Sequence, residues 1–421
     1  MTRTTKISDH RKQANPIKPA VLDSLPQRPL VSILISNYNY AAYLGDAIES
    51  CLGQTYDNLE IIVCDDGSTD ASPQVLEQYK SVDKRMNVVY QRNGGQALAL
   101  NSAFCKSSGE IICLLDADDV FAPDKLRSVV NSFAGAPDSG FAINRMLRVD
   151  KMRKFSGVIP MLSRLPSGWQ GPSLSLVAPQ MLSGMPPCSG LSLRRAIAEV
   201  IFPLPPGLTL YADTLIQVLA PLITPIVSIQ SPLSEYRIHG SNTAAVSAFA
   251  EDRLRNLVLW EREIWRAWRQ YLASCSELTS ASLPSSDAPY SPIAYAYARF
   301  RSDPDSKAVY DAIPPGYFRA LPKERKWFWR TSALMPDWLF RKWFAFVYGQ
   351  TRAKRVVSGI LSSFWSDFRA CKRFFERTEC TRHRVSNANR NARLNEISGC
   401  LQEIKVEGGS SSVCQRKGHA R

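Results

Sequence analysis

The sequence lacks several patterns that mark common protein classes. Its ten cysteines include no CxxC pair, so neither a zinc site nor a dithiol redox motif is indicated. Cys51, Cys64, Cys105 and Cys113 fall within predicted strands and helices, and we interpret them as reduced core residues. No GxGxxG follows the first predicted strand, and no GxxxxGK occurs with Ser or Thr after it. Dinucleotide-binding and P-loop proteins are therefore disfavoured.

Long apolar runs are also missing. The longest, residues 215–229, is interrupted by Gln217, Pro221 and Pro225. It is shorter than the roughly 20 residues that span a bilayer. The polar N-terminus has no continuous apolar stretch and does not resemble a secretory signal. We expect residues 1–28 to form a disordered leader, and we expect no segment to cross a membrane.

Acidic residues are too few to balance the basic ones. The chain has 52 Lys and Arg against 38 Asp and Glu, which gives a formal net charge of +14. Such an excess favours an anionic partner, which could be nucleic acid, acidic lipid or a phosphorylated ligand.

From Leu30 onward, continuous apolar segments alternate with amphipathic ones. The pattern predicts strands at residues 31–36, 59–66, 87–91 and 110–116, and helices at residues 41–52, 71–80, 96–107 and 123–133. A strand and helix are also expected within 190–202, and a helix over 211–222. Buried strands that alternate with helices are typical of a parallel sheet in an α/β domain.

Polar side chains follow three of these strands. The first strand ends in residues 36–39, the second in residues 65–70, and the fourth in Asp116, Asp118 and Asp119. Ligands of open α/β sheets bind outside the carboxyl ends of the strands, so these groups should converge on one crevice. Helix capping is an equally good explanation of Ser68 and Asp70.

Capping does not explain the carboxylates after the fourth strand, because Pro123 opens the next helix. Clustered carboxylates raise one another's pKa unless a cation is present. A hard divalent cation prefers oxygen ligands and often joins protein carboxylates to substrate phosphates. The acidic cluster therefore predicts a metal-bound diphosphate.

The segment "VSILISNYNYAAYLGDAIESCLGQTYDNLEIIVCDDGSTDAS", followed by "NGGQALALN" and "LLDADD", resembles the bacterial family-2 glycosyltransferases of the GT-A fold. The resemblance spans about Leu30 to Asn242. It implies a mostly parallel nucleotide-sugar-binding α/β sheet and transfer with inversion at the anomeric carbon. The QxxRW signature of processive synthases is absent, so we expect a non-processive enzyme that transfers one sugar at a time.

The resemblance also implies roles on the donor side of the site. Those near the nucleotide are Ser36, Tyr38, Asp66, Arg92 and Asp116. Asp118 is the first choice as metal ligand, with Asp116 and Asp119 as further ligands. Arg237 and His239 match a basic pair that closes over the diphosphate.

On the acceptor side, Asp213 matches the family's catalytic base within an "ED" motif. Ala212 stands where Glu is common, so only the second acid of that motif is present.

The C-terminal part has a different composition. We expect a catalytic domain at 29–248, a helical, basic and aromatic-rich extension at 249–380, and a polar disordered tail at 381–421. Residues 323–377 contain 13 Lys or Arg and four acids, with Trp and Phe interleaved. This pattern fits an anionic membrane surface. A helical cover packed on the catalytic domain is the alternative; single-stranded nucleic acid is not expected.

Together these features predict a glycosyltransferase that depends on Mg²⁺ or Mn²⁺. Its donor would be a nucleotide-diphosphate sugar, with UDP favoured, and its acceptor a surface polysaccharide or lipid-linked glycan. We expect it in the cytoplasm, peripheral to the inner face of the cell membrane. The rival hypothesis is a catalytically inactive nucleotide-sugar-binding module of the same fold. A nucleotidyltransferase is disfavoured because no GxGxR-like loop follows the first strand.

Overall fold

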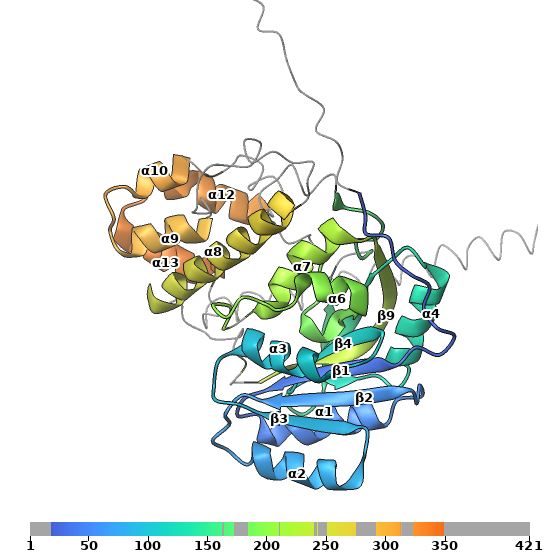
Figure 1. The fold of residues 1–421 in the computed structure, drawn as a ribbon. Coiled ribbons are helices and arrows are strands. Elements are labelled where there is room, and N and C mark those ends of the chain that lie inside the picture. Colours follow the sequence, from blue (N-terminus) through green and yellow to red (C-terminus); the bar gives the residue numbers. More distant parts are fainter. Residues whose placement is uncertain are drawn as a thin grey trace, which may run out of the picture. The chain divides into compact units, whose positions relative to one another are not determined.

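One mixed sheet organises the protein (Figure 1). The computed structural model describes residues 18–161, 164–171, 184–209, 211–239, 242, 251–274, 292–311, 313 and 323–348. Within them, nine strands form a sheet of order β3-β2-β1-β4-β8-β6-β9-β5, and β7 pairs with β6 outside this path.

The first half of the sheet is parallel, as predicted. Its elements are β1 (Val31–Asn37), α1 (Ala41–Leu52), β2 (Leu59–Asp65), α2 (Ser72–Val82), β3 (Met86–Tyr90), α3 (Gln96–Lys106) and β4 (Ile111–Asp116). All three pairings among these strands are parallel. The apolar β1, β2 and β4 are buried along almost their whole length, which is typical of a sheet covered on both faces.

The second half of the sheet mixes strand directions. Its elements are β5 (Val120–Phe121), α4 (Lys125–Gly135), β6 (Phe141–Asp150), β7 (Phe155–Ile159), η1 (Cys188–Gly190), β8 (Leu191–Arg194), α6 (Arg195–Ile201), α7 (Ala212–Ile223) and β9 (Ile226–Ile238). β8 runs antiparallel between β4 and β6, and β9 runs parallel to β6. The long strands β6 and β9 had no counterpart among the predicted elements.

Two apolar layers lie on opposite faces of the sheet. One joins α3, α6 and α7 to the sheet, and the other joins α1, α2 and α4 (Figure 1). Cys51, Cys64 and Cys113 are buried free thiols, as predicted, whereas Cys105 is exposed. The sheet, whose strand ends carry the predicted site residues, is therefore packed on both faces.

Helices fill the described part of the C-terminal extension. They are α8 (Glu251–Ser274), α9 (Pro292–Phe300), α10 (Ser306–Asp311), α12 (Lys323–Ser332) and α13 (Asp337–Tyr348). Trp268 and Leu272 of α8 belong to the apolar layer of α6 and α7, so α8 covers the catalytic domain. The other helices share a separate cluster around Phe328, Trp329 and Phe340. None of the helices in the described ranges is long and apolar enough to cross a bilayer.

The chain divides into two compact units, Met1–Gly349 and Gln350–Arg421, of which the second lies outside the described residues. Most of the basic stretch predicted at 323–377 and the tail predicted at 381–421 fall there. Residues 18–28 of the predicted leader lie against the domain, where Ala20 N–H donates to Ile223 O at 2.8 Å. The rest of the leader is outside the described ranges.

The start of α3 lies very close to the segment that precedes α7. Gly95 has φ +88°, and a Cβ on it would lie 2.6 Å from Thr209 Cα. Gln96 N–H donates to Thr209 O at 3.0 Å. Only glycine fits this conformation and this approach without strain.

We predict that Gly95→Ala lowers the free energy of unfolding by about 2–5 kcal/mol, because it combines a strained left-handed backbone with overpacking. Denaturant unfolding measures the change. Gly135→Ala is the matched control: a Cβ at Gly135 meets nothing within 4 Å, and stability should be unchanged or slightly higher. Equal effects of the two substitutions would contradict this account.

Candidate active site

A cavity of about 720 Å³ opens at the carboxyl ends of β1, β2 and β4. Its walls are the loop after β1, Asp66, the start of α3, the acidic turn after β4, residues 185–187, the first turn of α7 and Tyr236 of β9. The register of the ladders explains this convergence. Asn37 lies opposite Asp65, and Ser36 lies opposite Asp116, so the three strands end at one level.

Asp66 is buried at the edge of this cavity, with 3% of its surface exposed. Its carboxylate accepts hydrogen bonds from the backbone N–H groups of Gly94 and Gly95, at 2.9 and 2.7 Å, and from Gln91 Nε2 at 2.7 Å. Hydrogen bonds to an ionised acceptor are stronger than neutral ones. The glycine-bearing loop after β3 therefore fixes Asp66 in place.

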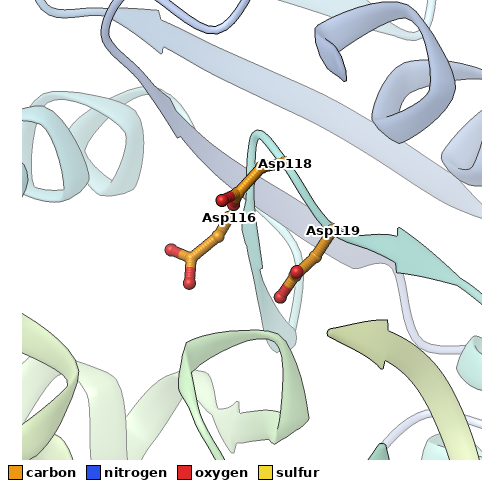
Figure 2. Close-up of side chains that lie close together, drawn as sticks. All are labelled: Asp116, Asp118 and Asp119. Atoms are coloured by element: carbon orange, nitrogen blue, oxygen red, sulfur yellow. The ribbon is translucent and has the colours of Figure 1, made fainter. Parts of the chain in front are cut away.

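Asp116, Asp118 and Asp119 form the acidic cluster of the site (Figure 2). One carboxylate oxygen from each lies within 4.8 Å of the others. Burial raises the pKa of Asp116 to about 8, and the nearby charges of Asp118 and Asp213 add to the rise. The cluster thus holds more negative charge than its surroundings stabilise.

Asp118 is held from the end of β9. Its Oδ2 accepts a hydrogen bond from Asn242 Nδ2 and lies 3.0 Å from His239 Nε2. The His239 ring stacks on Tyr43, with centroids 4.4 Å apart. These contacts fix the direction in which the Asp118 carboxylate points.

Asp119 is held more completely. Ser189 Oγ donates to its Oδ2 at 2.6 Å, and Arg237 N–H donates to its Oδ1 at 3.0 Å. Burial, followed by the charges of Asp118 and Asp116, raises the pKa of Asp119 well above its usual range. Because both oxygens serve as acceptors within the fold, Asp119 ties β5, η1 and β9 together.

Asp213 lies in the first turn of α7, on another wall of the same cavity. Gln217 Nε2 donates to its Oδ2 at 3.2 Å. Burial raises the pKa of Asp213 to about 6, and backbone N–H groups, including that of Cys188, limit the rise. A carboxylate with this pKa is mostly ionised at neutral pH but accepts a proton readily, as a general base must.

Comparison with known proteins assigns the chain to a family. The sequence model described as Glycosyl transferase family 2 matches residues 32–198. A glycosyltransferase of Nostoc is 36% identical over 236 residues, which cover 54% of this chain and 70% of the Nostoc protein. The chain belongs to glycosyltransferase family 2.

Other relatives match shorter stretches of this glycosyltransferase. The putative teichuronic acid biosynthesis glycosyltransferase TuaG of Bacillus subtilis is 38% identical over 118 residues, covering 26% of this chain and 47% of TuaG. Among solved structures, Staphylococcus aureus TarS in complex with UDP-GlcNAc has 17% identity and a TM-score of 0.49, with 74% of this chain and 89% of that one covered. The predicted fold class, a GT-A α/β sheet with a helical C-terminal extension, is confirmed by the family and the sheet described above.

The glycosyltransferase places most of its predicted site residues together. Those that line the cavity are Ser36, Tyr38, Asp66, Asp116, Asp118 and Asp213. Asp119 belongs to the acidic cluster but does not line the cavity, and His239 contacts the cluster through Asp118. Arg92 is exposed on the loop before α3 and does not line the cavity, although its neighbour Asn93 does. The roles assigned to these residues stay predictions.

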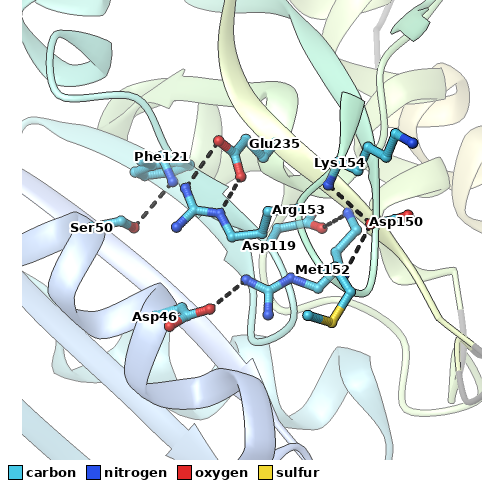
Figure 3. Close-up of polar contacts among 10 residues, drawn as sticks. Asp46, Ser50, Asp119, Phe121, Asp150, Met152, Arg153, Lys154 and Glu235 are labelled. Carbon is cyan, nitrogen blue, oxygen red and sulfur yellow. Dashed lines mark hydrogen bonds and ion pairs between the residues drawn. The ribbon is translucent and has the colours of Figure 1, made fainter. Parts of the chain in front are cut away.

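Arg237 does not line the cavity either. Its buried guanidinium pairs with Asp46 of α1 at 2.7 Å and lies 5.0 Å from the centre of the Tyr43 ring. Nearby, Arg153 forms a two-pronged ion pair with Glu235 at 2.8 and 3.0 Å (Figure 3). Arg237 therefore fastens β9 to α1, and its contact with a diphosphate would need a different side-chain conformation.

Sequence reasoning missed several residues of the site. Gln96, Asn242, Tyr236 and Gln217 contact the cavity or its carboxylates, but no role was predicted for any of them. Asn242 stands only three residues after His239 in "YRIHGSN", so its closeness to the basic pair was a usable signal. For Gln96, the only signal in the sequence was its position directly after Gly94 and Gly95.

The donor set of the acidic cluster fits a hard divalent cation. All its ligand atoms are carboxylate oxygens, which hard divalent cations prefer. Burial, with the charges of neighbouring aspartates, raises the pKa of Asp116 and of Asp119, and a bound cation would oppose both effects. Asp116 and Asp118 line the cavity and are the better ligands. Asp119 is better placed to support them, because both its oxygens already accept hydrogen bonds.

We predict that Asp116→Asn raises the melting temperature in chelator at pH 7.5 by about 2–4 °C or more. Between about pH 4 and 8 folded Asp116 keeps a proton that the unfolded chain has lost, so its contribution to stability falls as pH rises. The gain should shrink toward pH 4. Thermal unfolding measures it, with the exposed Asp138→Asn as control.

Mn²⁺ should reverse the order of stability. It should raise the melting temperature of the wild type more than that of Asp116→Asn, because a ligand stabilises the state that binds it. Equal shifts in the two proteins would count against Asp116 as a ligand.

Proposed function

We propose that this glycosyltransferase moves a single sugar, with inversion, from a UDP-sugar to an acceptor hydroxyl. One observation carries the proposal: carboxylates with three different predicted tasks, Asp66, the Asp116–Asp118 pair and Asp213, line one cavity but come from different elements. A nucleotide, a diphosphate and an attacking hydroxyl would need them in this order. The cavity volume of about 720 Å³ is within the usual range for small-molecule sites.

The chain's own groups supply binding, orientation and proton transfer. Asp66 and Tyr38 hold the nucleoside. Asp118 and Asp116 would hold a divalent cation, which would supply positive charge beside the diphosphate. Asp213 takes the proton of the acceptor hydroxyl while the acceptor oxygen bonds to the anomeric carbon and the bond from that carbon to the diphosphate breaks. The products are the glycosylated acceptor and UDP.

The proposed acceptor is a cell-surface polysaccharide or a lipid-linked glycan. Two relatives support this choice by name, TuaG of Bacillus subtilis and the chondroitin synthase of Escherichia coli, which is 37% identical over 110 residues. These matches cover about a quarter of this chain, and only 16% of the chondroitin synthase. The acceptor is accordingly proposed as a class.

The test is a panel of UDP- and GDP-sugars, each assayed for hydrolysis and transfer with Mn²⁺ or with excess chelator. We expect Asp213→Asn to slow turnover by about 10²–10⁴-fold, because the substitution keeps the shape and removes the base. UDP affinity, measured by calorimetry, should change little. Wild-type kcat/KM should fall as pH drops through about 6, where Asp213 gains a proton.

Three outcomes would speak against parts of the proposal. UDP-sugar binding without any turnover would favour the inactive binding module. Full activity in chelator would exclude the cation. A collapse of UDP affinity in Asp213→Asn would place this residue in the donor site instead.

We further infer peripheral association with the anionic inner face of the cell membrane. The support is the surface around α13, where Leu334 and Trp338 are 87% and 62% exposed and the basic Arg341 and Lys342 lie beside them. Lys342 Nζ lies 5.5 Å from the centre of the Trp338 ring. Exposed aromatic and basic side chains together suit the headgroup region of an anionic bilayer.

We predict that replacing Trp338 by Ala and Lys342 by Glu weakens binding of the full chain to phosphatidylglycerol vesicles by at least about tenfold. Each basic residue near such a surface contributes about 1 kcal/mol. Vesicle co-sedimentation at low and high salt measures the effect. The matched control changes Val82 to Ala and Lys84 to Glu, an exposed apolar and basic pair on the catalytic domain. Binding that ignores lipid charge would refute the inference.

A further inference from the structure

Gln96 bridges two walls of the cavity. Its Nε2 donates to Asp116 Oδ1 at 3.2 Å, and its Oε1 accepts a hydrogen bond from Ala212 N–H at 3.0 Å. Asp116 ends β4, and Ala212 begins α7 directly before Asp213. A single side-chain amide therefore spans from the acidic cluster to the helix that carries the proposed base.

The position of Gln96 is itself fixed by backbone contacts. Its N–H donates to Thr209 O at 3.0 Å, and the next residue, Ala97, donates to Leu208 O at 3.2 Å. Gly95 allows this approach because a side chain there would collide with Thr209. Gln96 thus begins from a backbone that already touches the segment leading into α7.

The hydrogen bond to Ala212 has a clear effect on α7. The first N–H groups of a helix have no partner within the helix and need an outside acceptor. At α7 the N-cap residue Tyr211 has left-handed φ and ψ of 56° and 36°, and its side chain makes no capping hydrogen bond. Gln96 supplies an acceptor from α3 and so fixes the first turn, in which Asp213 lies.

We propose that Gln96 is a positioning residue that sets Asp213 relative to Asp116 and so aligns the acceptor hydroxyl with the diphosphate end of the donor. The proposal rests on the proposed roles of these two aspartates. Gln96 acts through them and exchanges no proton. Small displacements of aligned groups are costly in rate, since about 1 Å can cost roughly 100-fold.

The test compares Gln96→Met with Gln91→Met in the full chain. Gln91 is a matched glutamine: its Nε2 donates to Asp66, and its Oε1 accepts from Ser102 Oγ at 2.5 Å. Gln96→Met should lower kcat by about 10–100-fold, with UDP affinity in Mn²⁺ within about threefold of the wild type. Gln91→Met should instead weaken UDP binding, because it removes a hydrogen bond that holds Asp66, the proposed nucleoside ligand. The rates are those of hydrolysis of UDP-glucose or UDP-GlcNAc, whichever is cleaved faster.

A double-mutant cycle separates positioning from general damage. If Gln96 acts by positioning Asp213, its replacement should matter little once Asp213→Asn has removed the base. In that background, Gln96→Met should lower kcat by less than about threefold. Gln91→Met should cost the same in both backgrounds. Additive losses for Gln96→Met and Asp213→Asn would overturn the positioning role while leaving Asp213 as the base. An active Asp213→Asn protein would overturn both.

Gln96→Glu covers the case in which Gln96→Met does not fold. The glutamate keeps an acceptor for Ala212 N–H but, when ionised, donates nothing to Asp116. The loss in kcat relative to the wild type should therefore stay below about tenfold, the lower limit expected for the methionine variant. UDP binding should weaken because a new negative charge faces the diphosphate. A kcat loss as large as that of Asp213→Asn would contradict the proposal, because the hydrogen bond from Ala212 N–H would still be present.

Discussion

Repulsion between partly buried carboxylates at the end of β4 is the constraint on which the rest of the site depends. Each carboxylate is stabilised by donors from a different part of the chain. Asp118 accepts a hydrogen bond from Asn242, which lies beyond β9. Asp119 accepts hydrogen bonds from η1 and β9, and Asp116 accepts one from α3. Segments far apart in sequence are thereby drawn to one point. If all three were ionised without a cation among them, their repulsion would lower the stability of the fold.

The sequence predicted the first half of the fold because local and global signals agree there. Apolar strands such as β1 and β4 are buried on both faces, so they appear as continuous apolar runs with polar groups only at the end. Once the strands are parallel, their register places Ser36 level with Asp116. Asp66, Asp116 and Asp118, which lie at the ends of these strands, are therefore apparent from the sequence, whereas Asp213 was predicted only from the family resemblance.

The second half could not be predicted in this way. β9 contains Pro232, which argues against a strand inside a sheet, and polar residues interrupt its pattern. The sheet accommodates it through register shifts on either side of Arg145, which pairs with Pro232. The sequence does not show side-chain directions either. Arg237 pairs with Asp46, and the Gln96 side chain bonds to Asp116 and Ala212 from a backbone that contacts Thr209.

The contact between Gly95 and Thr209 has a consequence for recombination within the family. Under the proposed roles, residues up to Asp119 would bind the nucleotide and the segment around α7 would bind the acceptor, so the two could be inherited as separate blocks. The two segments are in backbone contact where Gly95 and Gln96 approach Thr209. A chimaera that joined the first block to α7 of a relative would have to preserve this contact between the start of α3 and the segment before α7. If the proposed roles hold, this close contact would restrict which nucleotide-binding and acceptor-binding segments can be combined in one chain.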